Sequence, residues 1–222
     1  MKKYSVILSF LILLAFAATS HALSWDYTYA LGNGGYTSPY TNVTVITFDE
    51  ALPGGWELIG NNYQITQGTA SDAAAPWYDD GNGGARNLTY YLSVPRDVNV
   101  QPQSVVISFG GSVKDYFGLW WGSMDKYNTL DFLAADLITA VATVKGDAFS
   151  VADGNQNSGD TNKYVNFYGM GDFYGVRLTS TSYAFEIDNI AVVKSVVPEP
   201  ASMLLLGLGL MGLAAVRRKF QK

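Results

Sequence analysis

Residues 183–193 read Tyr-Ala-Phe-Glu-Ile-Asp-Asn-Ile-Ala-Val-Val, and their alternation is the clearest indication of the fold class. Their side chains alternate in character with the period of a β-strand, because successive residues of a strand point to opposite faces of a sheet. The alternation predicts two faces: Phe185, Ile187, Asn189 and Ala191 on one, and Ala184, Glu186, Asp188, Ile190 and Val192 on the other.

Upstream segments have the same character, being rich in β-branched and aromatic residues and punctuated by Gly, Asn, Asp and Pro. They are residues 43–48, 88–94, 104–109, 116–121, 165–168 and 175–179. Residues 131–143 are long enough for a short helix, but the run from Ile138 favours a strand. The sequence therefore predicts an all-β protein with a single, jelly-roll-like β-sandwich.

The N-terminus has the organisation of a secretory signal peptide. Lys2 and Lys3 precede an apolar run at 6–18, and Ser20-His21-Ala22 supplies small residues for signal peptidase. Residues 1–22 are thus expected to be removed by cleavage after Ala22.

Removal of the signal restricts the chemistry left to the chain. The one histidine lies inside the signal and the chain has no cysteine, which excludes Ser-His-Asp and Cys-His catalysis and zinc sites built from nitrogen and sulfur. Residues 23–197, the expected surface domain, hold 8 basic and 18 acidic residues, a net charge of 8 − 18 = −10. Such a surface repels phosphate backbones, so we expect no nucleic-acid partner.

Residues 198–222 form a separate C-terminal unit. Pro198-Glu199-Pro200 breaks regular structure, residues 201–216 are almost wholly apolar, and Arg217, Arg218 and Lys219 follow within the basic end 217–222. We expect a transmembrane helix at 201–216 with the basic end on the cytoplasmic side. A permanent anchor that is never cut is the alternative to a processed tail.

This arrangement resembles the PEP-CTERM sorting signal of Gram-negative bacteria. The resemblance implies that exosortase, a membrane-embedded transpeptidase, recognises Pro198, Glu199 and Pro200 and cuts near them. It also implies that Arg217 and Arg218 stop the transfer of the chain through the membrane. It also implies an inner-membrane-anchored precursor whose mature domain reaches the cell surface or the extracellular matrix.

The middle of the chain carries two further likenesses. Residues 116–130 and 178–190 resemble a group of exosortase-dependent surface proteins of polysaccharide-forming bacteria, largely without assigned function. Ile46-Thr-Phe-Asp-Glu50, together with Phe-Glu-Ile-Asp-Asn-Ile at 185–190, is similar to jelly-roll carbohydrate-binding modules.

Four tryptophans are candidates for stacking on sugar rings. Trp120 and Trp121 are consecutive, so they should lie on opposite faces of one strand, one inward and one exposed. Trp56 and Trp77 lie in loop-like surroundings. The alternative is that all of these rings belong to the core and its cover.

Two sets of oxygen-bearing residues are candidates for calcium. Jelly-roll modules often share a structural calcium between first and last strands, and the resemblance places it at Asp49 or Glu50 and Asp188. The second set is a loop with alternating ligands, Asp153, Asn155, Asn157 and Asp160, which lacks a carboxylate twelve positions after its start. Turn-capping explains these residues as well.

These features predict an exported structural or adhesive protein that binds exopolysaccharide. We expect no enzyme, because no local signature selects a catalytic pair among the many carboxylates. A polysaccharide hydrolase or lyase is one alternative. A matrix protein without a ligand is another, expected if the tryptophans are fully buried.

Overall fold

The computed structural model describes residues 22–28, 31–32 and 35–194. These residues are almost entirely β-structure, with one short 3-10 helix at Gly146–Ala148. The strands are β1 Ser24–Thr28, β2 Leu31–Gly32, β3 Gly35–Tyr36, β4 Thr44–Ile46, β5 Glu57–Ile59, β6 Gln64–Thr66, β7 Trp77–Tyr78, β8 Ala85–Arg86, β9 Tyr91–Val94, β10 Ser104–Gly122, β11 Asn128–Leu133, β12 Ala140–Lys145, β13 Lys163–Ser180 and β14 Phe185–Lys194. The all-β prediction is confirmed.

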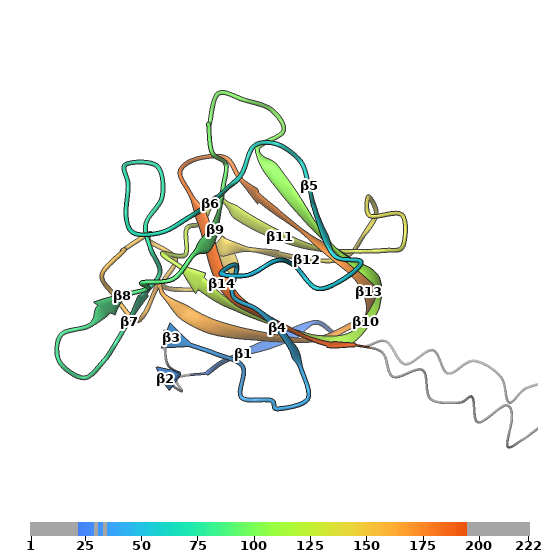
Figure 1. The fold of residues 1–222 in the computed structure, drawn as a ribbon, viewed down its shortest axis with the longest axis horizontal. Coiled ribbons are helices and arrows are strands. Elements are labelled where there is room, and N and C mark those ends of the chain that lie inside the picture. The colour runs from blue at the N-terminus through green and yellow to red at the C-terminus, as the bar shows by residue number, and fades with distance from the viewer. Residues whose placement is uncertain (1–21, 29–30, 33–34, 195–222) are drawn as a thin grey trace, which may run out of the picture.

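Two long antiparallel strands, β10 and β13, organise the molecule. Their register shifts between Ser108 and Val113, where β10 bends. Gly110 allows the bend, because it adopts a φ of 65° and a Cβ there would lie 2.3 Å from the carbonyl oxygen of Gly55. Only glycine tolerates this backbone without strain. The bend folds one sheet of ten strands back on itself into two layers, the curled form visible in Figure 1.

The first half of β10 and the second half of β13 belong to one layer, together with β11, β12 and β5. The other halves of the two strands belong to the second layer, together with β1, β14, β4, β9 and β6. Every pairing in the sheet is antiparallel. The result is a single β-sandwich in which both layers share their two central strands.

Aromatic rings fill the space between the layers. Phe132 of β11 lies 5.5 Å from Phe117 of β10 and 5.6 Å from Phe167 of β13, measured between ring centroids. All three side chains are fully buried. A core of this size can stabilise a domain that has no disulfide, since each buried phenylalanine contributes about 1.5–3 kcal/mol.

The opposite face of the second layer is also covered. Trp120 of β10 packs there against Tyr36 of β3 and Tyr78 of β7, with centroids 5.8 Å and 5.9 Å away. Gly35 permits the close approach, because any Cβ at this position would overlap the Trp120 ring. Both faces of β10 are therefore buried at this point.

Three sequence expectations need correction. The segments 104–109 and 116–121 are one strand, as are 165–168 and 175–179, because glycine bends continue each strand instead of ending it. The helix alternative at 131–143 is wrong, since these residues lie in β11, a turn and β12. The predicted faces of β14 hold only as far as Asp188.

A bulge at Asn189 causes that last difference. Asn189 has a φ of 49°, and the register with β10 jumps from Gly118 opposite Ala191 to Trp120 opposite Asp188. The extra residue resets the alternation. Ile190 and Val192 consequently join Phe185 and Ile187 in the main core, while Ala191 faces the Trp120 side.

The first and last described segments meet at the bend. Val113 pairs with Lys194, the last residue of β14, and Ala22 lies beside Gly169 of β13. Within the described residues, no helix has the length and apolar character needed to cross a bilayer. The predicted membrane helix at 201–216 and most of the predicted signal lie outside them.

Candidate functional site

A polar cavity of about 150 Å³ lies at the end of the sandwich opposite the bend. Gly122 at the end of β10 pairs with Glu186 at the start of β14, and four loops surround this point. The lining residues come from segments distant in sequence: Ser71, Asp72, Ala73, Ala74, Ser123, Asp125, Tyr127, Asp153, Gly154, Gln156, Tyr183, Ala184 and Glu186. We call this cavity the acidic pocket, because four of these side chains are carboxyls.

Glu186 lies at the base of the acidic pocket and is almost completely buried. Its Oε1 accepts a hydrogen bond from the backbone N–H of Ala74 at 2.8 Å, and its Oε2 accepts one from Ser123 Oγ at 2.8 Å. Burial raises the pKa of Glu186 to about 7, because desolvation disfavours the charged carboxylate. The two hydrogen bonds fix the 71–74 loop against β10 and β14.

Asp125 forms one wall of the acidic pocket. Tyr127 Oη donates a hydrogen bond to its Oδ2 at 2.6 Å, and Gly154 fits against its Oδ1 only because glycine lacks a side chain. Burial raises the pKa of Asp125, and the negative charge of Asp153 acts in the same direction. The pocket thus brings together carboxyls that are partly shielded from water.

The chemistry of the acidic pocket is that of a hydrogen-bond acceptor. An ionised carboxylate accepts hydrogen bonds and cannot donate them, so a matching ligand must present donors, as the hydroxyl groups of a sugar do. Tyr183 lies at the pocket with 38% of its surface exposed. Such a ring can pack against the apolar face of a saccharide.

Three of the four predicted sugar-stacking tryptophans are buried in the core. Trp120 and Trp121 lie on opposite faces of β10 as expected, but both have 0% exposure and Trp56 has only 6%. The expectation of an exposed ring on this strand is wrong, because the β3 and β7 segments cover the second face. Trp77 is half-buried and packs over Gly84 and Gly159. Trp56, Trp120 and Trp121 have no free ring face and therefore cannot stack on a sugar.

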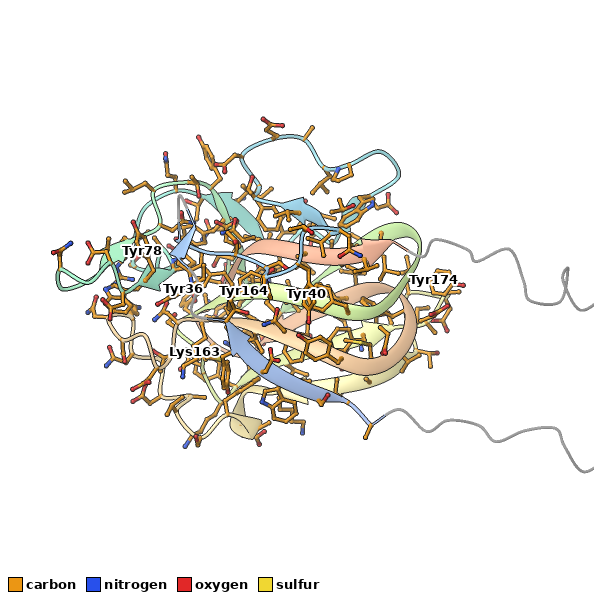
Figure 2. The ribbon with its side chains drawn as sticks, turned by 90° about the horizontal axis from the view of Figure 1, so that it is seen from below. Tyr36, Tyr40, Tyr78, Lys163, Tyr164 and Tyr174 are labelled. Atoms are coloured by element: carbon orange, nitrogen blue, oxygen red, sulfur yellow. The ribbon has the colours of Figure 1, made fainter. Side chains whose placement is uncertain are left out.

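The aromatic rings that reach the surface belong mostly to residues outside the predicted set of four tryptophans. Trp25 of β1 and Tyr40 are 37% and 43% exposed. Tyr40 stacks edge-on against Tyr116 at 4.7 Å, and the hydroxyl oxygens of Tyr40 and Tyr168 lie 2.9 Å apart. Figure 2 looks onto this side of the molecule, with Tyr40, Tyr164 and Tyr36 labelled across it.

Asp188 and Asp49 are close enough to interact. Burial, with the charge of Asp49 adding to it, raises the pKa of Asp188 to about 8. Asp188 Oδ2 accepts from Asn87 Nδ2 at 2.6 Å, and its Oδ1 from the backbone N–H of Asn189 at 2.7 Å. Asp188 and Asp49 are the two carboxyls of the first predicted calcium set, and carboxylate oxygens are ligands that calcium prefers. Glu50 is exposed.

In the second calcium candidate, the loop 153–160, the side-chain oxygens already have partners within the protein. Asp153 and Asn155 each cap a turn through the backbone N–H two residues on, and Asp160 lies 3.7 Å from the Lys163 ammonium. Asn157 Oδ1 accepts a 2.6 Å hydrogen bond from the Arg86 guanidinium, which would repel a cation. In the described part of the chain, no three acidic or histidine side chains converge on a metal-sized position.

Comparison with known protein families gives a match for the C-terminal residues. Residues 196–219 match the family model of the PEP-CTERM protein-sorting motif. The chain carries a PEP-CTERM sorting motif. This motif marks an exported, membrane-anchored precursor that an exosortase processes into a surface protein. Pro198, Glu199, Pro200, Arg217 and Arg218 fall within it, outside the described residues.

The described domain has two structural likenesses. Two mutants of CBM29-2, a family 29 carbohydrate-binding module, each align with 12% identity and a TM-score of 0.39. The first alignment covers 71% of this chain and 96% of the module, and the second 72% and 100%. A search of curated proteins found no similar sequence.

Proposed function

We propose that the exported domain is a structural or adhesive component of the cell surface or extracellular matrix that binds exopolysaccharide. The observation that supports this proposal is the acidic pocket, where carboxylate acceptors and an exposed tyrosine ring surround a cavity of about 150 Å³. Sugar hydroxyl groups supply hydrogen-bond donors for these carboxylates. Before cleavage the membrane helix holds the protein at the bilayer, and signal peptidase and exosortase are its processing partners.

A pull-down with the host's own exopolysaccharide, with and without calcium, tests this proposal. We expect retention of the wild-type protein and weaker retention of Asp125→Asn and Asp153→Asn, because each loses a charge-assisted acceptor worth about tenfold in affinity. Glu57→Gln is the matched control, since Glu57 is an exposed acid on β5 outside the pocket. Absence of retention under both conditions would remove the sugar-binding function.

A polysaccharide hydrolase or lyase is the second candidate, and the two shielded carboxyls of the acidic pocket, Glu186 and Asp125, favour the hydrolase. Glycosidases use one carboxyl with a raised pKa as the acid and a second carboxylate as base or nucleophile. Burial gives Glu186 the first property. If the wild type releases reducing ends from matrix polysaccharide and Glu186→Gln does not, the protein is an enzyme; if the wild type releases none, this candidate is rejected.

A matrix protein without a ligand is the third candidate. The burial of Trp56, Trp120 and Trp121 favours it, since these rings serve the core. This candidate predicts that a glycan array and the exopolysaccharide pull-down are both negative while the protein still fractionates with the matrix.

We further propose that a structural calcium ion binds at Asp188 and Asp49. A bound divalent cation would neutralise the buried Asp188 carboxylate and connect β14 to the segment that follows β4. This role is separate from ligand binding in the acidic pocket, because Asp188 and Asp49 do not line it.

A further inference from the structure

A second, more open cavity of about 520 Å³ runs beside the edge strand β6. Its lining residues are Gly60, Asn61, Tyr63, Gln64, Ile65, Thr66 and Arg96. None of them lines the acidic pocket. The cavity combines an aromatic ring, two side-chain amides and one guanidinium, and we call it the Arg96 groove.

Buried Asn62 holds the two walls of the Arg96 groove together. Its Nδ2 donates to the carbonyl oxygens of Asp97 at 2.9 Å and Val100 at 2.7 Å, and its Oδ1 accepts from the backbone N–H of Asp97 at 2.8 Å. The backbone N–H of Arg96 also donates to the Asn62 carbonyl oxygen at 3.1 Å. Arg96 and Tyr63 are therefore positioned on a fixed backbone, which lowers the entropic cost of binding a ligand.

The Arg96 guanidinium differs from the other arginines of the domain. Arg177 pairs with Asp131 at 2.7 Å, and Arg86 donates to Ala75 and Asn157. The Arg96 side chain has no such partner among the described residues, although acids outnumber bases 18 to 8 in residues 23–197. A planar guanidinium matches a carboxylate with two parallel hydrogen bonds.

We propose that the Arg96 groove binds a carboxylate-bearing sugar unit of an acidic polysaccharide. The guanidinium recognises the carboxylate, the Tyr63 ring packs against the apolar face of the sugar, and Asn61 hydrogen-bonds its hydroxyl groups. The net negative charge of the domain does not prevent this contact, because repulsion beyond about 8 Å is largely screened at physiological salt. The groove is a second site, so it and the acidic pocket can fail independently.

Titration of the full chain, purified in mild detergent, with hexagalacturonate and with its fully methyl-esterified form tests the proposal. We expect the wild type to bind the acidic hexamer at least tenfold more tightly than the ester, because esterification removes the charge that Arg96 recognises. Arg96→Ala should bind both forms equally weakly. Arg96→Lys should recover only part of the preference, since an ammonium lacks the bidentate geometry.

Lys145→Ala is the matched control, because Lys145 is an exposed cation on β12 and its loss changes the net charge equally. It should bind the acidic hexamer like the wild type. The exopolysaccharide pull-down with Asp125→Asn and Asp153→Asn tests the acidic pocket separately from this titration. Equal affinity of the wild type for acid and ester, unchanged binding by Arg96→Ala, or no binding of the acidic hexamer would each overturn the proposal.

Discussion

Glu186 and Asp188 are buried carboxyls two residues apart on β14, with pKa values raised to about 7 and about 8 mainly by burial. Their folded pKa values exceed the ordinary values of 4.5 and 3.8. Between roughly pH 4 and pH 8 the folded state therefore binds more protons than the unfolded state. Linkage then requires the free energy of unfolding to fall as pH rises through this window.

Glu186→Gln should remove part of this pH dependence. Glutamine stays neutral and its carbonyl oxygen can still accept from Ala74, so the variant should match the wild type near pH 5. At pH 8 it should be more stable, by an upper limit on the order of 3 kcal/mol at about 1.4 kcal/mol per pKa unit. Urea unfolding at both pH values measures this. Glu57→Gln serves as control, and parallel profiles for wild type and Glu186→Gln would contradict the prediction.

Calcium should stabilise the protein through Asp188, and more at pH 8 than at pH 5. Near pH 5 the cation must displace a proton from Asp188, which weakens its binding. Asp49→Asn keeps an acceptor for the backbone N–H of Tyr90 but loses the second charge, so its melting temperature should respond little to calcium. Differential scanning calorimetry with calcium or chelator decides this; an equal response in wild type and variant would exclude the site.

At the scale of elements, the glycine bend of β10 determines whether the sheet can form two layers. Gly110→Ala should destabilise the domain by roughly 2 kcal/mol or more, because the new Cβ meets the Gly55 carbonyl at 2.3 Å in a left-handed backbone. Gly111→Ala is the matched control, since a Cβ there has no heavy atom within 4 Å. Thermal unfolding of the two variants should differ clearly, and equal midpoints would show that the bend tolerates a side chain.

The segments that form β4, β9, β10, β13 and β14 were predictable from the sequence, but the continuity of β10 and β13 was not, and short strands such as β1, β5 and β6 were missed. Glycine pairs normally end a strand, and only tertiary pairing with β13 shows that Gly110 and Gly111 bend one instead. The bulge at Asn189 was equally hidden, because a period of two carries no sign of an inserted residue. The bend at Gly110 and the bulge at Asn189 account for these differences, and each depends on pairing with a strand that is distant in sequence.

The candidate sites were less accessible to sequence reasoning than the fold. The acidic pocket takes its lining from four separate loops, so no local spacing marks it. The Trp120-Trp121 pair suggested an exposed ring, but the β3 and β7 segments cover that face. The association of Asp49 with Asp188 was expected from the jelly-roll resemblance and lies within electrostatic range.

At the scale of the whole molecule, the PEP-CTERM motif leads to a prediction about the mature chain. Protein recovered from its native host should end near Pro198, because exosortase processing separates the domain from the membrane helix. Mass spectrometry of the C-terminal peptide measures this end. The unprocessed precursor, isolated from a host strain without exosortase, is the control. A mature protein that still ends at Lys222 would identify a permanent anchor.

The glycine bend also sets how the domain faces its surroundings. Lys194 and Ala22 both lie at this bend, while Gly122 and Glu186 lie at the far end of the same strand pair. Ten residues of β14 span about 30 Å at roughly 3.3 Å per residue. A membrane anchor that follows Lys194 would therefore join the domain at the end opposite the acidic pocket, about 30 Å away from it.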